Sequence, residues 1–341
     1  MVGIPESKMH IGLLGTGSAV PERILTNAEL ESMVDTSDEW IVSRTGIRER
    51  RIAEEGTASS HLAYDAALKA LASAKLKAED LDLIICATVT PDMAFPATAC
   101  LLQDLLGVKS IPSFDLSAGC SGFGYALTVA ESMLLSGSYT KALVVGVDIL
   151  SRITDYEDRS TSVLFGDGAG AAILGEVPEG FGFLATELGA DGASGGVLQM
   201  PGGGSLRPAS ASTVEERQHY IKMQGSDVFK FAVRVMDEAA KRVVAKAGLS
   251  MEDIHWVVPH QANIRIIKSA AARLGIPEER FFVNVDRYGN TSAASIGLAL
   301  DELARTGELK KGDYVVLVGF GAGLTWSALV IKWWSGEKSR D

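Results

Sequence analysis

Residues 111–137 read IPSFDLSAGCSGFGYALTVAESMLLSG, and residues 281–307 read FFVNVDRYGNTSAASIGLALDELARTG. In each stretch an apolar run typical of a strand is followed by a turn of small residues and then by a helical pattern that ends near a glycine. Similarity of this kind indicates an internal repeat, in which one folded unit occurs twice in the chain.

Two further pairs of segments support the repeat. Residues 63–92 and residues 228–262 both predict an amphipathic helix, a short loop and a buried strand. Residues 163–176 and residues 316–331 both carry Gly-Ala-Gly between apolar runs, which predicts two strands joined by a tight turn in each. The chain is therefore predicted to be an α/β protein made of duplicated α/β halves, with its sheets covered by helices.

The boundary between the halves is predicted between residues 176 and 177. This gives an N-terminal half of residues 1–176 and a C-terminal half of residues 177–341. Residues 191–212, DGASGGVLQMPGGGSLRPASAS, are rich in Gly, Ser and Pro and are predicted to form a loop. A loop of this length is most often either a lid or a surface insertion, and the sequence leaves both open.

The composition restricts the class of protein. A chain of 341 residues with 47% hydrophobic and 22% charged residues is typical of a soluble globular protein with two packed halves. No apolar run of about 18 residues predicts a membrane-spanning helix. The net charge of −11 argues against binding to nucleic acid. Three cysteines, an odd number, argue against a disulfide framework and favour a reducing, cytoplasmic location.

Cys120 lies in the small-residue turn of the first repeat, where a strand passes into a helix. Unsatisfied backbone N–H groups at such a turn stabilise a thiolate, so this position is predicted to lower the pKa of the thiol. The same N–H groups can bind an oxyanion, and the small neighbours leave room for a substrate carbonyl. The alternative is a small buried cysteine without a chemical role, which is our interpretation of Cys86 and Cys100.

Two polar residues occupy corresponding strand ends in the second half. Asn290 lies in the turn that matches the turn of Cys120, and His260 directly follows the strand WVVP. If the halves pack about a pseudo-twofold axis, the three side chains meet at its centre. A histidine moves protons near neutral pH, but it is equally a hydrogen-bonded core residue, and Gly-Asn is a common turn signal. No Cys/His spacing suits a metal site, so no metal is expected.

With these three residues in these contexts, the sequence resembles the β-ketoacyl-acyl carrier protein synthase III family of thiolase-like condensing enzymes. Four long matches carry the resemblance: residues 36–50 (TSDEWIVSRTGIRER), 165–172 (FGDGAGAA), 258–266 (VPHQANIRI) and 289–295 (GNTSAAS). It extends over essentially the whole chain. The implied fold is thiolase-like, with the duplicated halves forming a layered helix/sheet sandwich.

The resemblance implies a reaction of two half-reactions, the initiating condensation of type II fatty acid synthesis. Acyl-CoA first acylates Cys120. Malonyl-acyl carrier protein then loses CO2, and His260 and Asn290 donate hydrogen bonds to the resulting enolate, which attacks the acyl-cysteine. The backbone N–H groups of Cys120 and Ala322 are implied to hold the oxyanion. The product is a β-ketoacyl-acyl carrier protein.

The resemblance also implies binding residues for acyl-CoA. Trp40 and Arg152 are implied to sandwich the adenine, and Phe95 to cap the acyl pocket across a dimer interface. Both aromatic residues have a simpler interpretation as core side chains. The remaining residues implied to contact CoA are Thr36 and Arg44 at the nucleotide and Asn263 at the pantetheine arm.

Acyl carrier protein is strongly acidic, so its docking requires a local basic rim on this acidic chain. The candidate residues are Lys230, Arg265, Lys268 and Arg273. A set of unrelated solvated charges is the alternative, particularly for Lys268. The implied partners are acyl carrier protein, acyl-CoA as substrate, and a second copy of the chain in a homodimer. No permanently bound cofactor, nucleic acid or membrane is expected.

Three other functions stay open at the level of the sequence. A CoA-dependent condensing or acyl-transferring enzyme of secondary metabolism would keep Cys120 without using a carrier protein. A thioesterase would let water attack the acyl-cysteine, but water needs a base, and Asn290 is an amide. An acyl-binding protein would have no use for His260 and Asn290. The starter acyl chain is not predicted.

Overall fold

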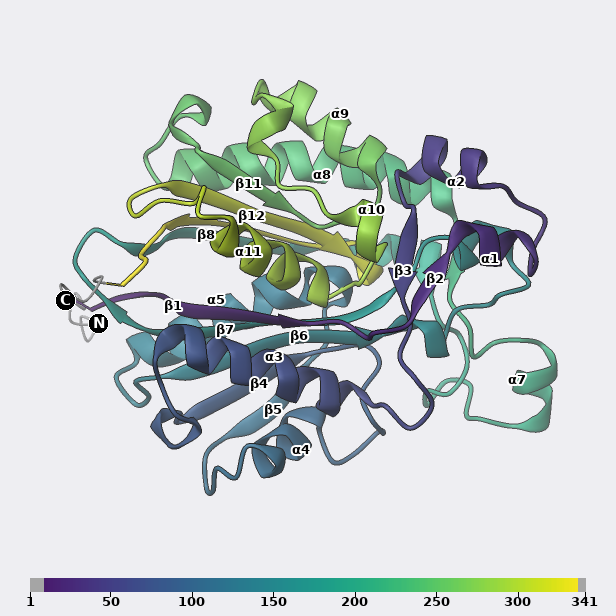
Figure 1. Cartoon of the computed structure of the whole chain (residues 1–341), viewed down its shortest axis with the longest axis horizontal. Coiled ribbons are helices and arrows are strands. Elements are labelled where there is room, and N and C mark those ends of the chain that lie inside the picture. Colours follow the sequence, from purple (N-terminus) through teal and green to yellow (C-terminus); the bar gives the residue numbers. More distant parts are fainter. Residues whose placement is uncertain (1–8, 337–341) are drawn as a thin grey trace.

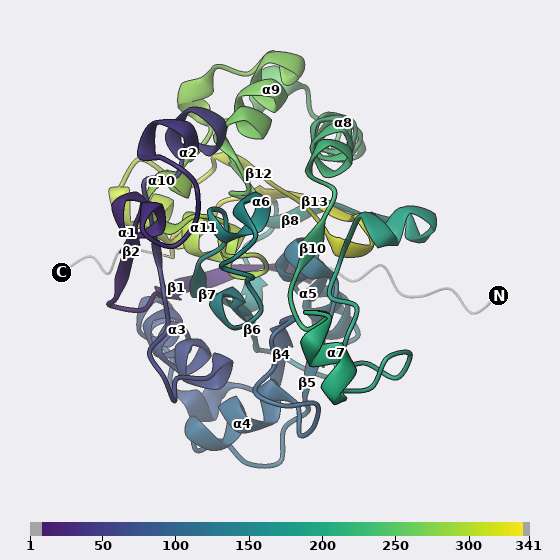
Figure 2. The same cartoon turned by 90° about the vertical axis from the view of Figure 1, so that its right-hand side faces the viewer.

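The computed structural model describes residues 9–336 as an assembly of two main sheets with helices above, between and below them (Figures 1 and 2). The first sheet has five strands in the order β1-β7-β6-β4-β5, and the second has four in the order β11-β12-β13-β8. The bounds of these strands are β1 (His10–Ala19), β4 (Leu83–Ala87), β5 (Ser113–Leu116), β6 (Ala142–Ile149), β7 (Asp167–Val177), β8 (Gly182–Ala190), β11 (Trp256–Pro259), β12 (Tyr314–Gly321) and β13 (Thr325–Lys332).

Strand directions repeat between the two sheets. In the first sheet β4 and β6 are parallel, and β7 and β1 continue antiparallel. In the second, β11 and β12 are parallel, and β13 and β8 continue antiparallel. The chain passes from one sheet to the other between Val177 and Gly182. This topology confirms the predicted architecture of duplicated α/β halves.

Helices form three layers around the sheets, as seen end-on in Figure 2. Helices lie on the outer face of each sheet, and others are packed between the two sheets. The apolar face of each helix supplies the burial that holds the layers together. The helices are α3 (Ser59–Ala74) and α4 (Thr98–Leu105) below, α5 (Gly122–Leu135) and α11 (Ala294–Thr306) in the centre, and α8 (Gly225–Lys246) and α9 (Ile264–Leu274) above.

One strand predicted by the repeat is absent among the described residues. The segment after Phe281, which matches β5, forms only a single parallel bridge between Phe281 and Val257 and then the short helix α10 (Val285–Tyr288). The side chain of Gln261 takes over the backbone pairing there. It donates to the carbonyls of Pro259 (2.9 Å) and Phe282 (3.0 Å), and its Oε1 accepts from two backbone N–H groups of the segment.

The prediction for the two Gly-Ala-Gly segments is right in one half and wrong in the other. Residues 316–331 form β12, a turn and β13, as predicted. In the first half, residues 167–177 form one continuous strand, β7. Its glycines allow α11 to pack closely on the strand. A Cβ on Gly170 would lie only 2.4 Å from the backbone N of Leu298. Because α11 packs directly on the strand here, glycine is required without a turn.

The segment 191–212 is more ordered than the predicted loop. Gly192–Val197 form a 3-10 helix, and β9 (Leu198–Gln199) pairs antiparallel with β10 (Lys222–Met223). The short elements not yet named are β2 (Ile24–Thr26), α1 (Asn27–Glu31), α2 (Asp38–Thr45), β3 (Glu49–Arg51), α6 (Arg159–Ser162) and α7 (Ala211–Glu215). None of the helices within residues 9–336 has both the length and the hydropathy needed to cross a membrane.

Candidate active site

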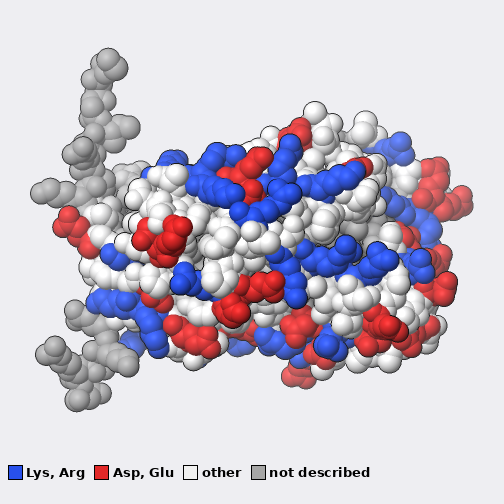
Figure 3. Space-filling model, turned by 90° about the horizontal axis from the view of Figure 1, so that it is seen from above, with Lys and Arg blue, Asp and Glu red and all other residues white. Residues whose placement is uncertain are grey.

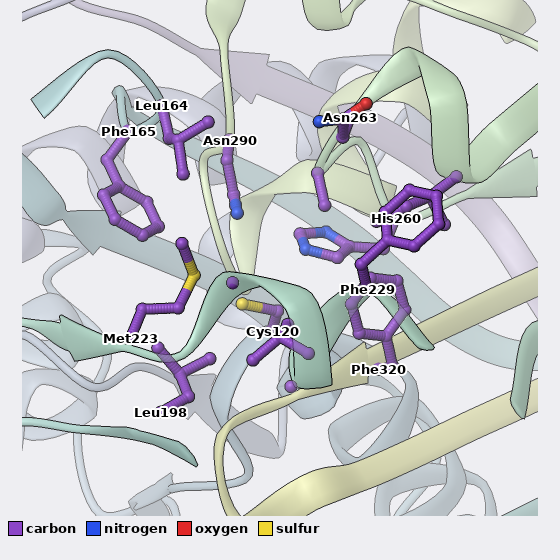
Figure 4. A pocket seen from close by; sticks show the side chains of 15 residues that line it. Cys120, Leu164, Phe165, Leu198, Met223, Phe229, His260, Asn263, Asn290 and Phe320 are labelled. Carbon is purple, nitrogen blue, oxygen red and sulfur yellow. The ribbon is translucent and has the colours of Figure 1, made fainter. Parts of the chain in front are cut away.

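The three polar residues singled out in the sequence line one cavity of about 170 Å³. Figure 4 shows the Cys120 sulfur, the Asn290 amide nitrogen and the His260 ring turned toward the same space. Most of the other lining side chains are apolar: Leu164, Phe165, Leu198, Met223, Val228, Phe229, Ala262, Ile266 and Phe320. The structure therefore brings the three residues together, within largely apolar walls.

Cys120 stands at the start of α5, within the 3-10 turn Gly119–Ser121. This turn presses against the end of β12. A Cβ on Gly119, whose φ is +56°, would lie 2.6 Å from the backbone N of Ala322, and one on Gly321 would lie 2.3 Å from the backbone N of Cys120. The glycines thus allow the amides of Cys120 and Ala322 to lie close together beside the sulfur.

The predicted direction of the Cys120 pKa is wrong. Burial raises the pKa of this thiol to about 12, and the hydrogen bond from the Ser292 side chain and the backbone N–H of Cys120 itself only reduce the rise. The sequence shows a helix start, which stabilises a thiolate, but it does not show that the sulfur is only 9% exposed. The resting side chain is therefore a neutral thiol.

His260 directly follows β11, and its backbone N–H donates to the carbonyl of Val318 at 2.8 Å. The side chain is buried, and neither ring nitrogen has a hydrogen-bond partner among the described residues. Burial lowers the pKa of His260 to about 3, so the imidazole is neutral at physiological pH. A neutral imidazole has one N–H donor and one acceptor, and the described residues leave both without a partner.

Asn290 is held by its backbone and oriented by its side chain. Its N–H donates to the carbonyl of Leu164 (2.8 Å), and its carbonyl accepts from Gly166 (3.0 Å). Its Oδ1 accepts from the backbone N–H of Ser292 at 2.9 Å. Because the oxygen is committed to Ser292, the amide NH2 is the group that faces the cavity, as Figure 4 shows.

Asp148 and Ser292 are structurally close to the site but were not identified from the sequence. Asp148 is a fully buried carboxylate near the end of β6, and Ser292 has a φ of +49°, which is unusual for a residue other than glycine. The available signal was a lone aspartate at the carboxyl end of the apolar run ALVVGVDI. Residues at this end of a parallel strand commonly face a site.

The structure places Arg159, and not the predicted Arg152, against Trp40, while the adenine sandwich itself stays a prediction. Arg159, at 5.0 Å, is the cation that lies over the ring of Trp40. Arg152 instead donates to the carbonyl of Glu54 at 2.6 Å and lines a separate cavity with Arg23 and other residues. Both arginines follow β6 within a short irregular segment, so the sequence does not reveal which of them turns toward α2.

The other residues implied to contact CoA lie around the entrance. Trp40 and Thr36 are half-buried, and the Thr36 hydroxyl has no hydrogen-bond partner among residues 9–336. Asn263 lines the cavity of Cys120, caps α9 by accepting from Arg265 N–H (2.8 Å), and donates to the carbonyl of Arg44 (3.0 Å). Asn263 thereby ties α9 to the end of α2.

Phe95 is not among the described residues that line the two cavities at Cys120. Its side chain is 85% exposed and precedes a cis peptide bond to Pro96, so it is not the core phenylalanine of the simpler interpretation. A second cavity of about 180 Å³ shares Cys120, Phe165 and Leu198 with the first. Its apolar lining residues are Val89, Leu150, Ile153, Phe165, Leu198, Met200, Ile221 and Ala322. Leu198 and Met200 come from the segment predicted to be a loop.

The predicted docking residues are exposed on α8 and α9, on the face shown in Figure 3, where basic side chains are interspersed with acidic ones. Lys230 lies 3.4 Å from Asp227, and Lys268 lies 3.7 Å from Glu278. Arg265 instead lies over the ring of Phe229, 5.6 Å from its centre, and Phe229 lines the cavity of Cys120. Of the four residues, Arg265 is the one connected to the site.

The chain matches two family models that together include all three site residues. Residues 114–192 match the model described as 3-oxoacyl-[acyl-carrier-protein] synthase III, and residues 244–333 match the model of the C-terminal part of that enzyme. The first segment contains Cys120, and the second contains His260 and Asn290.

Similar proteins agree over almost the full length. The chain is 57% identical over 325 residues to the β-ketoacyl-[acyl-carrier-protein] synthase III of Desulfitobacterium hafniense, which covers 95% of this chain and 98% of that protein. The crystal structure of the Thermus thermophilus enzyme of this name matches with a TM-score of 0.89 and 49% identity, over 95% of this chain and all of that one. A priming β-ketosynthase from a polyketide pathway matches with a TM-score of 0.89 at 36% identity, over 97% of this chain and 98% of that one.

Proposed function

The chain belongs to the 3-oxoacyl-[acyl-carrier-protein] synthase III family, the thiolase-like condensing enzymes that initiate fatty acid synthesis, and we propose that Cys120, His260 and Asn290 carry out its reaction. The observation that carries this assignment is the single apolar cavity into which all three side chains point. The higher identity to a synthase III (57%) than to a polyketide priming enzyme (36%) supports fatty acid synthesis over secondary metabolism.

In the first half-reaction, Cys120 attacks the thioester carbonyl of acyl-CoA. The new C–S bond forms at Cys120, the C–S bond to CoA breaks, and the thiol proton ends on the sulfur of CoA. The neutral His260 ring is the acceptor available within the cavity for that proton on its way. The adjacent amides of Cys120 and Ala322 donate to the oxyanion of the tetrahedral intermediate.

In the second half-reaction, the malonyl thioester loses CO2 and becomes an enolate. The N–H of neutral His260 and the NH2 of Asn290 donate hydrogen bonds to the negatively charged enolate oxygen. Both donors are already in position. The enolate carbon attacks the acyl-cysteine, and the thiolate of Cys120 leaves and takes up a proton. An imidazolium is not required, since burial strengthens a neutral hydrogen bond to a charge.

The test separates the two half-reactions. His260→Ala and Asn290→Ala should each lower malonyl decarboxylation by about 10²- to 10³-fold, the usual cost of one lost oxyanion donor. Asn290→Ala should leave acylation of Cys120 by acyl-CoA within about threefold, because Asn290 acts only on the enolate. Equal losses in both half-reactions for Asn290→Ala would contradict the assigned role.

We propose that the cavity of about 180 Å³ beyond Cys120 receives the acyl chain, since its walls are apolar. Phe95 is proposed to complete this cavity in a partner subunit. Two features support a homodimer: the large exposure of Phe95 and the open edge of β5, which ends its sheet. Phe95→Ala should widen the range of accepted acyl chains, measured as kcat/KM over a series of acyl-CoAs. An unchanged range would contradict this role.

For CoA we propose that adenine enters between Trp40 and Arg159, with Thr36, Arg44 and Asn263 nearby. Arg159 is 50% exposed and can move away from the indole to admit the base.

Arg265 is proposed as the main contact of the acidic carrier protein. Arg265→Glu should raise KM for malonyl-acyl carrier protein more than Arg273→Glu does, and equal effects would contradict a specific role for Arg265.

We also propose that the protein is cytoplasmic and holds no permanently bound cofactor. Three free cysteines and the lack of a membrane-spanning helix within residues 9–336 support the cytoplasm. The reaction needs no electron transfer and no metal, so we propose that acyl-CoA enters only as substrate, with no permanently bound cofactor. A metal analysis of the purified protein that found one bound ion per chain would contradict this.

A further inference from the structure

Asp148 is a buried carboxylate for which the reaction above assigns no role. It is fully buried, and no described cation forms an ion pair with it. Its Oδ1 accepts from the backbone N–H groups of Val89 (2.8 Å) and Thr90 (3.1 Å) and from the hydroxyls of Thr88 and Thr90, each at 3.0 Å. A carboxylate buried without a cation is tolerated only where hydrogen bonds such as these replace its hydration.

The second oxygen of Asp148 reaches into the other half of the molecule. Its Oδ2 accepts from the backbone N–H of Ala293 at 3.1 Å. The preceding residue, Ser292, has a φ of +49°, a strained conformation for serine. The bond to Ala293 fixes the peptide that follows Ser292 and so holds this conformation in place.

The backbone of Ser292 orients the Asn290 amide. Its N–H donates to Oδ1 of Asn290 at 2.9 Å, which leaves the NH2 facing the cavity. The side chain of Ser292 also lies beside both Asp148 and Cys120. Contacts therefore run without a gap from Asp148 through residues 292 and 293 to Asn290 and the reacting sulfur.

We propose that Asp148 is a positioning residue for the decarboxylation step, whose carboxylate holds residues 290–293 so that the Asn290 amide points at the enolate oxygen. This rests on the proposed role of Asn290. Asp148 does not touch substrate and acts through Asn290. A role confined to supporting the turn of residues 88–90 would instead affect stability alone.

Asp148→Asn tests the proposal with little change in volume. The carboxamide has one oxygen, so its NH2 opposes an N–H donor, either at Ala293 or at the turn of residues 88–90. We expect malonyl decarboxylation to fall by about 10²-fold, as for a lost donor. Acylation of Cys120 by acyl-CoA should change by less than about threefold. Asp148→Ser, which has no NH2 to oppose these donors, should show the same split if the first variant folds poorly.

A matched control is Asp167→Asn. Asp167 is also fully buried, and it accepts from Ala53 and Ser151, but no hydrogen bond joins it to residues 290–293. Loss of Asp167 should lower the melting temperature comparably while leaving the ratio of the two half-reactions unchanged. The same split in this variant as in Asp148→Asn would overturn the proposal.

A double-mutant cycle gives the sharpest readout. In the background of Asn290→Ala there is no amide left to orient, so adding Asp148→Asn should lower decarboxylation by less than about threefold further. A full, additive loss of about 10²-fold would mean that Asp148 acts independently of Asn290 and would overturn the inference. If Asn290→Ala itself left decarboxylation intact, the assigned role of Asn290 would fail, which is a distinguishable result.

Discussion

At Cys120, burial and the backbone act in opposite directions on the same sulfur. The helix start and the neighbouring N–H groups favour the thiolate, but the loss of water costs more, and the pKa rises to about 12. A thiol with a raised pKa reacts slowly with alkylating agents, so under the proposed mechanism we expect activation of Cys120 to depend on the bound substrate rather than on a resting thiolate.

The pH dependence of alkylation tests this description. The rate at which iodoacetamide modifies Cys120 should rise about tenfold per pH unit between roughly pH 7 and pH 10, because the thiolate fraction grows in that proportion below the pKa. Peptide mass spectrometry would follow Cys120 itself, with Cys120→Ala to show the background from the other two cysteines. A plateau near neutral pH would mean that the pKa is low and that the resting residue is a thiolate.

The two arginines of the CoA site make a second prediction at this scale. Arg159→Ala should raise KM for acyl-CoA by about 2- to 30-fold, the range expected for loss of about 0.5–2 kcal/mol of cation–π stacking. Arg152→Ala serves as its matched control and should change KM by less than about twofold. The reverse order of effects would restore the arginine that the sequence suggested.

The reacting residues could be predicted from the sequence because each of them follows a predicted strand or turn that the internal repeat places centrally. The environment of these residues could not be predicted from the sequence. The exclusion of water from Cys120 and His260 depends on side chains from segments far apart in the chain, such as Leu198 and Phe229. Asp148 was visible as a lone carboxylate on an apolar strand, but its bond to Ala293 spans the two halves.

At the scale of elements, the side chain of Gln261 supplies hydrogen bonds that a further strand would otherwise have made. The helices were predictable because their apolar positions recur with the helical period. The segment after Phe281 has the apolar character of a strand, yet its neighbour β11 contributes only one bridge to it. The amide of one side chain forms hydrogen bonds with backbone groups that strand pairing would have used. No local sequence pattern indicates that a side chain takes this role.

Gln261→Leu should therefore be strongly destabilising. It leaves two buried N–H groups, at Asn284 and Val285, and two buried carbonyls, at Pro259 and Phe282, without these partners. At about 1–3 kcal/mol for each unsatisfied group, we expect a loss of at least about 3 kcal/mol in the free energy of unfolding, measured with urea.

The matched control for this variant is Gln199→Leu, since Gln199 is exposed and makes one hydrogen bond of 3.3 Å. It should cost less than about 1 kcal/mol. Equal urea midpoints for Gln261→Leu and the unmodified protein would show that the segment is held by other contacts.

At the scale of the whole molecule, the buried His260 makes the folded protein less stable in acid. The pKa of His260 is lowered to about 3 in the folded protein, against 6.5 for the free side chain. Between these values the unfolded chain binds a proton that the folded chain does not, so stability is lost as the pH falls from about 6.5 toward 3. His260→Asn removes this contribution.

The expected difference between the two proteins is about 1.4 kcal/mol per pH unit in that window, with the unmodified protein losing stability more steeply. Urea unfolding at a series of pH values would measure it. Parallel slopes for the two proteins would indicate that His260 keeps an ordinary pKa in the folded state.

The two halves meet where the chemistry is proposed to occur. Cys120 comes from the half that carries the five-stranded sheet, and His260 and Asn290 come from the half that carries the four-stranded sheet. The chain crosses between the sheets after Val177, the last residue of β7, so the division proposed between residues 176 and 177 lies one residue before that crossing. A site built at this junction needs both halves folded, because neither contributes a complete set of donors and nucleophile.

Intact-protein mass spectrometry tests the central claim most directly. The protein is exposed to a panel of acyl-CoAs and then to malonyl-acyl carrier protein, with Cys120→Ala as the control. We predict one acyl group added per chain, absent in the control, and its discharge as a β-ketoacyl-acyl carrier protein. An adduct that persists in Cys120→Ala, or one that only water removes, would contradict the assignment of Cys120 as the acyl-accepting nucleophile of a condensing enzyme.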